Sequence, residues 1–127
     1  MIIAIDFDGI LCTNEFPDIG SPDYEMISIV RQLIDAGHEV ILWTSRTGEE
    51  LIAAIDWCGE RGLHFTEVNE NAPSNREQYE RKYPQGTRKI YADIYVDDHN
   101  VGFNEVTGYD RTKVIKWLQK GVRQWEV

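Results

Sequence analysis

Apolar residues follow two alternating patterns along this chain: short continuous runs, and stripes at helical spacing. The first run opens the chain as Met1–Ile5 and is rich in β-branched residues, which is typical of a parallel strand buried on both faces. It predicts a strand over residues 2–7. Comparable runs at 39–43, 64–68 and 90–96 predict three further strands.

The stretches between these runs predict helices. Ser21 suits an N-cap, and Gly37 suits the left-handed residue that ends a helix, so a first helix is expected between them. Thr47 and Glu50 form a capping box, which predicts a second helix over residues 48–60. The residues expected to face inward on this second helix are Leu51, Ile55 and Cys58.

Two further helices are expected in the second half of the chain. A short polar helix is predicted over residues 76–83, and Asp110 is expected to cap a last helix that ends before Gly121. Residues 104–109 are expected to form a loop or weak edge strand, and Trp125 is expected to dock the tail. The residues expected to face inward on the last helix are Val114, Ile115 and Leu118.

The order of these elements predicts the fold class. Residues 9–20 are rich in turn formers and predict a flap or tight hairpin over the end of the first strand. Apart from this flap, strands and helices alternate, which is typical of a three-layer α/β/α, Rossmann-like fold with a parallel sheet and right-handed crossovers. With 127 residues, the chain is expected to form one domain over residues 1–127.

Polar residues lie at the carboxyl ends of the predicted strands, namely Asp6, Asp8, Thr44, Asn69 and the pair at 97–98. In such folds ligands bind at the carboxyl ends of the strands, so we expect these residues to share one edge. Two carboxylates about 4 Å apart repel by about 4 kcal/mol at an effective dielectric constant near 20, so Asp6 and Asp8 require a positive group nearby. The alternative is that these two aspartates only cap and form a turn.

This arrangement of acids indicates a particular chemistry. Several carboxylates at one edge favour a hard cation, and ligation by oxygen alone favours Mg²⁺ over zinc. A carboxylate nucleophile, a second carboxyl group as acid and base, a hydroxyl group and a cation suffice for phosphoryl transfer through an aspartyl-phosphate. The alternative is a non-catalytic α/β domain with acidic loop ends.

Three segments resemble the motifs of one enzyme superfamily. The segment Asp6-Phe-Asp-Gly-Ile-Leu resembles the DxDG(T/V) first motif of the haloacid dehalogenase-like (HAD) phosphatases. The segment Ile-Leu-Trp-Thr44 resembles the second motif, and Val96-Asp-Asp98 resembles the fourth. The motifs occur in the order of the superfamily, and the resemblance spans residues 1 to about 100.

The resemblance implies a role for each matching residue. Asp6 would be the nucleophile, and Asp8 would be the general acid and base, with a backbone carbonyl group that ligates Mg²⁺. Thr44 would bind a phosphoryl oxygen. Asp97 and Asp98 would hold the metal directly or through water.

The basic third motif of the superfamily is assigned to Lys89, because Lys89-Ile-Tyr-Ala-Asp93 resembles a K-x-x-A-D stretch of some short members. A fully extended strand would place Lys89 about 26 Å from Asp97, so the assignment requires residues 89–92 to loop back and the strand to start near Asp93. The other basic candidates are Arg76, Arg81, Lys82 and Arg88.

The turn after Thr44 is a second candidate for phosphate binding, because it offers hydroxyl groups and backbone N–H groups at a helix start. Ser45 and Arg46 lie in this turn. Arg46 is expected to share or replace the role of Lys89. The alternative is an ordinary surface arginine at the beginning of a helix.

The gaps between the motifs are too short for the cap domain that most superfamily members carry. An open site suits a bulky or macromolecular phosphate, a sugar phosphate, or closure by a second subunit in a homo-oligomer. The leading prediction is a Mg²⁺-dependent phosphomonoester hydrolase. The rival predictions are a receiver-like signalling domain and a domain of this fold that has lost its activity.

Composition and charge indicate which partners and which cellular location to expect. The net charge of −9 repels polyanions, so non-specific binding of nucleic acid is not expected. No apolar run reaches the roughly 18 residues that a membrane span needs, and the start lacks a signal sequence, which predicts a cytoplasmic protein without membrane partners. Cys12 and Cys58 lack metal-binding spacing and are expected to be packed thiols.

Overall fold

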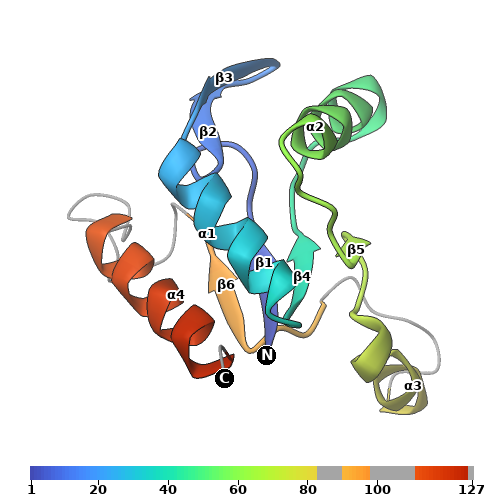
Figure 1. The fold of residues 1–127 in the computed structure, drawn as a ribbon. Coiled ribbons are helices and arrows are strands. Elements are labelled where there is room, and N and C mark those ends of the chain that lie inside the picture. Colours follow the sequence, from blue (N-terminus) through green and yellow to red (C-terminus); the bar gives the residue numbers. More distant parts are fainter. Residues whose placement is uncertain (83–89, 98–110, 126–127) are drawn as a thin grey trace.

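The computed structural model describes residues 1–82, 90–97 and 111–125, without the side chains of residues 79–80 and 123–125. Its main sheet is parallel and has the strand order β5-β4-β1-β6 (Figure 1). These strands are β1 (Ile2–Ile5), β4 (Glu39–Leu42), β5 (Glu67–Val68) and β6 (Ile94–Val96). The predicted parallel α/β sheet is therefore confirmed, with strands that are shorter than the apolar runs suggested.

One face of the sheet packs against helices. Ile3 and Ile5 of β1 and Val40 and Leu42 of β4 alternate onto this face, as the two-residue period of a strand requires. Buried residues of the helices complete this cluster. The helices are α1 (Tyr24–Asp35), α2 (Gly48–Glu60) and α4 (Arg111–Trp125), and α1 and α4 lie side by side (Figure 1).

The opposite face carries a second apolar cluster. Ile2, Ala4 and Ile41 point to this side, because they are the alternate residues of the same two strands. Ala72, which precedes α3 (Pro73–Lys82), packs against them, together with Ile90 and Ala92. The partly buried Trp43 packs against this cluster. With both faces covered, the chain has the three-layer, Rossmann-like α/β fold that its element order predicts.

The predicted flap is a two-stranded antiparallel hairpin, formed by β2 (Cys12–Glu15) and β3 (Asp18–Pro22). It rises at the end of the molecule where β1 leaves the sheet (Figure 1). Gly20 allows the two strands to approach, because an added Cβ there would lie 2.2 Å from the carbonyl oxygen of Thr13. No larger insertion separates β1 from α1, and every residue between them is described.

The start of α1 differs from the prediction. The N-cap is Asp23 and not Ser21, because Ser21 and Pro22 belong to β3. The carboxylate of Asp23 accepts a hydrogen bond of 3.1 Å from the backbone N–H of Met26. The Arg111 guanidinium also binds this carboxylate, at 2.7 and 2.8 Å, and lowers its pKa.

Three other details of the helices differ from the prediction. Thr47 is the N-cap of α2, but its side chain makes no capping hydrogen bond. Ile55 was expected to face inward but is 38% exposed, because Ala54 and Cys58 supply the buried face of α2. Helix α4 continues past Gly121 to Trp125. Asp110 and residues 104–109 lie outside the described residues, as does the side chain of Trp125.

His38 lies in the core, where α1 leads into β4. Its imidazole is buried, with Nδ1 3.1 Å from the amino group of Met1 and Nε2 3.3 Å from the carbonyl oxygen of Gly121. An ammonium group donates to Nδ1 and Nε2–H donates to the carbonyl group, so the pairing fits a neutral ring. Burial, which is the largest cause, lowers the pKa of His38.

We therefore expect the free energy of unfolding to fall as the pH drops through about 6.5, the ordinary pKa of histidine. In that window the unfolded chain binds a proton that the folded chain does not, so stability is present above it and is lost below it. Urea denaturation at several pH values measures this. His38→Gln should flatten the pH dependence, whereas the exposed His64→Gln should not; equal slopes in both variants would contradict the prediction.

Candidate functional site

The site lies where β1, β4 and β6 end. Ile5 pairs with Val96 in the sheet, and the N–H of Asp6 donates to the carbonyl oxygen of Val96 at 2.9 Å. Asp6 and Asp97 therefore follow directly after paired residues of neighbouring strands. A pocket of about 610 Å³ opens here, lined by Asp6, Asp8, Asn14, Phe16, Trp43, Thr44, Ser45 and Asp97.

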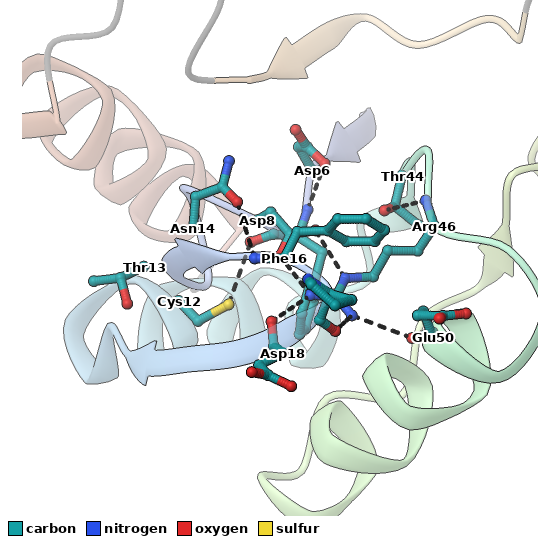
Figure 2. Close-up of polar contacts among 12 residues, drawn as sticks. Asp6, Asp8, Cys12, Thr13, Asn14, Phe16, Asp18, Thr44, Arg46 and Glu50 are labelled. Carbon is teal, nitrogen blue, oxygen red and sulfur yellow. Dashed lines mark hydrogen bonds and ion pairs between the residues drawn. The ribbon is translucent and has the colours of Figure 1, made fainter.

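The loop after β1 holds the first two acids in fixed positions. Asp6 Oδ1 accepts a hydrogen bond of 2.7 Å from the N–H of Phe7, which fixes the rotation of the carboxylate (Figure 2). Phe7 is fully buried and packs edge-on against Trp57, with 5.4 Å between the ring centroids. Gly9 turns the chain at φ +86°, a conformation that favours glycine. The loop is thus anchored on both sides of Asp8.

The positive group that the two acids require is Arg46. Its Nε donates to Asp8 Oδ2 at 2.8 Å and its Nη2 donates to Asp8 Oδ1 at 2.7 Å, so the two side chains form a bidentate pair. Arg46 is only 2% exposed, and its hydrogen bonding to the Asp8 carboxylate is the main cause of its raised pKa. The alternative of an ordinary surface arginine is therefore wrong.

Arg46 also binds the flap and α2. Nη1 donates to the carbonyl oxygens of Pro17 and Glu50, at 3.1 and 3.5 Å, and Nη2 donates to that of Asp18 at 2.8 Å. The ring of Phe16 stacks on the guanidinium, 5.1 Å from the ring centroid (Figure 2). All five N–H donors of Arg46 thus have partners within the protein. The expected role of Arg46 in phosphate binding stays a prediction, and it would require one of these bonds to open.

Thr44 is held from two sides at the end of β4. Its N–H donates to Asn69 Oδ1 at 2.8 Å, and its Oγ1 accepts the N–H of Arg46 at 3.1 Å. The second bond uses a lone pair of the hydroxyl group, so the hydroxyl hydrogen is left to donate to an acceptor in the pocket. Asn69 adopts a left-handed conformation at φ +53°, which asparagine tolerates. Ser45, the next residue in the turn, is exposed and also lines the pocket.

A metal site at this edge would use few protein ligands. Within the described residues, no group of three or more histidine, cysteine, aspartate or glutamate side chains is arranged to hold a metal ion. The side chain of Asp8 is instead bound to Arg46. Mg²⁺ commonly takes one or two carboxylates and keeps several waters, so Asp6 and Asp97, which line the same pocket, are the side chains that could hold it. Asp98 lies outside the described residues.

Lys89 also lies outside the described residues, but the neighbouring strand bears on its assignment. Strand β6 begins at Ile94, close to the start near Asp93 that the assignment requires. The N–H of Asp93 donates to the carbonyl oxygen of Ile2 at 2.8 Å, and its Oδ2 accepts the N–H of Ile2 at 2.7 Å. Residue 93 therefore marks the amino edge of the sheet, opposite the pocket.

Three residues of the pocket were not predicted from the sequence: Asn14 and Phe16 of the flap, and Trp43 directly after β4. The sequence signal that could have indicated Phe16 is an aromatic residue next to a proline in a polar turn.

The cysteines Cys12 and Cys58 are free and buried, as expected, and burial raises the pKa of Cys58 to about 12.

Comparison with solved structures places the chain in a family. It is similar to a conserved protein from Bacteroides thetaiotaomicron, with 33% sequence identity and a TM-score of 0.71, over 92% of this chain and 91% of the other. The chain belongs to the family of that protein. The family shares the three-layer fold described above over nearly the whole chain. No protein-family model matches the chain, and no curated protein does.

A helix that crosses a membrane needs about 20 consecutive, predominantly apolar residues. None of the helices in residues 1–82 and 111–125 combines the necessary length with the necessary apolar character.

Replacing Arg46 should cost much of the stability of the fold. Arg46→Met removes every contact of the guanidinium and leaves Asp8, whose side chain is 15% exposed, without its partner. We expect the free energy of unfolding to fall by about 3 kcal/mol, because a largely buried charge loses its counter-ion. Guanidinium denaturation measures the loss.

Arg81→Met is the matched control for this variant. Arg81 is exposed and pairs only with Glu77 one turn away in α3, so its loss should change the stability by no more than about 0.5 kcal/mol. Adding Asp8→Asn to Arg46→Met should restore part of the stability, because the unpaired charge is removed. Similar losses in the two arginine variants would contradict the structural role of Arg46.

Proposed function

We propose that this protein is a Mg²⁺-dependent phosphomonoester hydrolase of the HAD type, in which Asp6 forms an aspartyl-phosphate. One observation carries the proposal. Asp6 and Asp8 from β1, Thr44 from β4 and Asp97 from β6 line a single pocket at the carboxyl edge of the sheet. The three matching motifs are far apart in the sequence, and a turn-forming role for the aspartates gives no reason for them to share a cavity.

In the first step an oxygen of Asp6 attacks phosphorus, and the bond from phosphorus to the ester oxygen breaks. The leaving alkoxide takes a proton from the carboxyl group of Asp8, so that an alcohol departs. The hydroxyl group of Thr44 donates a hydrogen bond to a phosphoryl oxygen. The enzyme now carries phosphate on Asp6 and a carboxylate on Asp8.

In the second step water attacks the phosphorus of the aspartyl-phosphate. Asp8 takes a proton from this water, and the bond between phosphorus and the Asp6 oxygen breaks to release inorganic phosphate. Asp6 is again a carboxylate and Asp8 again carries a proton. The sum of the two steps is the hydrolysis of a phosphate ester to an alcohol and phosphate.

Asp8 requires a rearrangement before it can act in these steps. Both of its carboxylate oxygens are bound to Arg46, so at least one of those bonds must open for Asp8 to reach the leaving group. Arg46 keeps its bonds to the carbonyl groups of Pro17 and Asp18 in the flap while this happens. The mechanism therefore needs Asp8 to rotate away from the arginine and, because it is a carboxylate while it pairs with Arg46, to take up a proton from water before the first step.

The acids near the phosphate need a compensating charge. When bound, Mg²⁺ supplies a cation that lets the carboxylate of Asp6 approach an anionic phosphate. Asp6 and Asp97 would hold it with the backbone carbonyl of Asp8, and Asp98 and Lys89 keep their proposed roles as metal ligand and phosphate-binding cation. We also propose a cytoplasmic setting, in keeping with the free thiols of Cys12 and Cys58.

The variant Asp6→Asn tests the covalent route. It removes the nucleophilic charge with little change in volume, so hydrolysis of p-nitrophenyl phosphate should fall on the order of 10³-fold or more while urea denaturation shows a folded protein. Acid quenching with a ³²P-labelled phosphate ester should trap a labelled protein in the parent and none in the variant. Substantial residual turnover would exclude Asp6 as the nucleophile. A stable label without turnover would favour a receiver-like domain.

The metal can be tested through binding as well as activity. EDTA should stop hydrolysis and added Mg²⁺ should restore it, while Mg²⁺ alone should raise the melting temperature because it binds only the folded state. Asp97→Asn should reduce this rise. Asp56→Asn is the control, since Asp56 is exposed on α2 and does not line the pocket. Hydrolysis that is unaffected by EDTA would remove the metal from the mechanism.

A further inference from the structure

The pocket has an aromatic wall that the hydrolytic chemistry does not use. Phe16 lies at the tip of the flap and is 58% exposed, although it is a large apolar residue beside a group of carboxylates. Its position is not that of a loosely attached surface residue. One face of its ring stacks on the buried Arg46, which also binds the carbonyl groups of the next two residues, Pro17 and Asp18 (Figure 2). A buried cation thus holds an exposed aromatic ring at the mouth of the pocket.

A second aromatic residue reaches the same pocket from the sheet. Trp43 follows β4, and its backbone N–H donates to the carbonyl oxygen of Ile5 at 2.8 Å. Part of the indole packs against the apolar cluster of Ile2, Ala4 and Ile41, and the residue also lines the pocket. It is therefore as firmly placed as Phe16, although it comes from a different element.

Asn14 adds a polar group to this wall. Its Oδ1 accepts the N–H of Phe16 at 3.3 Å, which leaves the amide NH₂ group to donate elsewhere. The volume of about 610 Å³ is that of a site for a small molecule and exceeds what a phosphate alone would occupy. The space that a phosphate would leave is lined by the aromatic side chains of Phe16 and Trp43 and by the amide of Asn14.

From this arrangement we propose that the substrate is a nucleoside monophosphate, whose base lies against Phe16 and Trp43 while its phosphate lies at Asp6. This inference rests on the proposed phosphatase activity. A nucleobase presents flat faces for stacking and acceptors at its edge for the amide of Asn14, whereas the hydroxyl groups of a bare sugar phosphate would meet aromatic rings. The same base occurs at the end of a nucleic acid. The net charge of −9 favours the mononucleotide over a polyanion.

The test compares two esters with the same kind of leaving oxygen. Adenosine 5′-monophosphate and 1-O-methyl-ribose 5-phosphate both release a primary ribose alcohol and differ in the base. We expect kcat/KM to be about 10-fold or more higher for the nucleotide, because base stacking contributes to binding. A ratio near one, with both esters hydrolysed, would overturn the inference and leave the phosphatase proposal intact.

Variants of Phe16 and Trp43 test whether these two rings cause the preference for the nucleotide. Phe16→Leu and Trp43→Leu keep apolar bulk but remove the ring, so each should lower the ratio of the two kcat/KM values several-fold. Tyr24→Leu is the control, because Tyr24 is 70% exposed and does not line this pocket. An unchanged ratio in both aromatic variants would overturn the assignment. A higher kcat/KM for a 3′-phosphorylated oligonucleotide would overturn the choice of a mononucleotide.

Binding to the Asp6→Asn protein separates recognition from chemistry. Calorimetric titration with the same two esters should show about 10-fold tighter binding of the nucleotide. Tighter binding without turnover in the parent protein would indicate a nucleotide-binding site, and would overturn both the phosphatase proposal and the assignment of the nucleotide as its substrate. Equal binding of the two esters would overturn the inference, whatever the activity.

Discussion

The ion pair between Asp8 and Arg46 holds the parts of the site together. A guanidinium that is 2% exposed has lost nearly all its water, and the fold compensates with a carboxylate, three carbonyl groups and two aromatic rings. These partners come from the loop after β1, from the flap and from α2. Fixing one side chain therefore fixes three segments. It also places a cation beside one of the two acids that follow β1.

The sheet provides the second constraint. Because β1 lies between β4 and β6, residues that follow these three strands meet at one edge even though they are up to 91 residues apart, as Asp6 and Asp97 are. In this chain the flap lies over that edge and contributes Asn14 and Phe16 to the pocket. The flap is small, and Phe16 at its tip is one of the residues that line the pocket at this edge.

These two constraints explain an apparent conflict in the site. The residue that the proposed mechanism needs as a mobile acid and base, Asp8, is also the residue that the fold uses to neutralise a buried arginine. The conflict is tolerable because Arg46 has other partners and does not depend on Asp8 alone. One ion pair thus has a structural role and, in the proposed mechanism, a chemical one.

The sequence by itself determined the features that depend on local order. The four strands, the span of α2 and the placement of Asp6, Asp8 and Thr44 at strand ends follow from apolar runs and capping residues close together in the chain. Element ends were less certain: Ser21 and Asp23 can each cap a helix, and only the pairing of β3 with β2 excludes Ser21.

Tertiary structure alone decided the environment of the site. Arg46 lies 38 residues from Asp8, and its burial depends on how the flap folds over it. Phe16 and Trp43 share a pocket only because a hairpin and a strand end meet in space. Contacts of this kind arise from packing between distant segments, and hydrophobic periodicity records which side of an element is buried but not what lies against it.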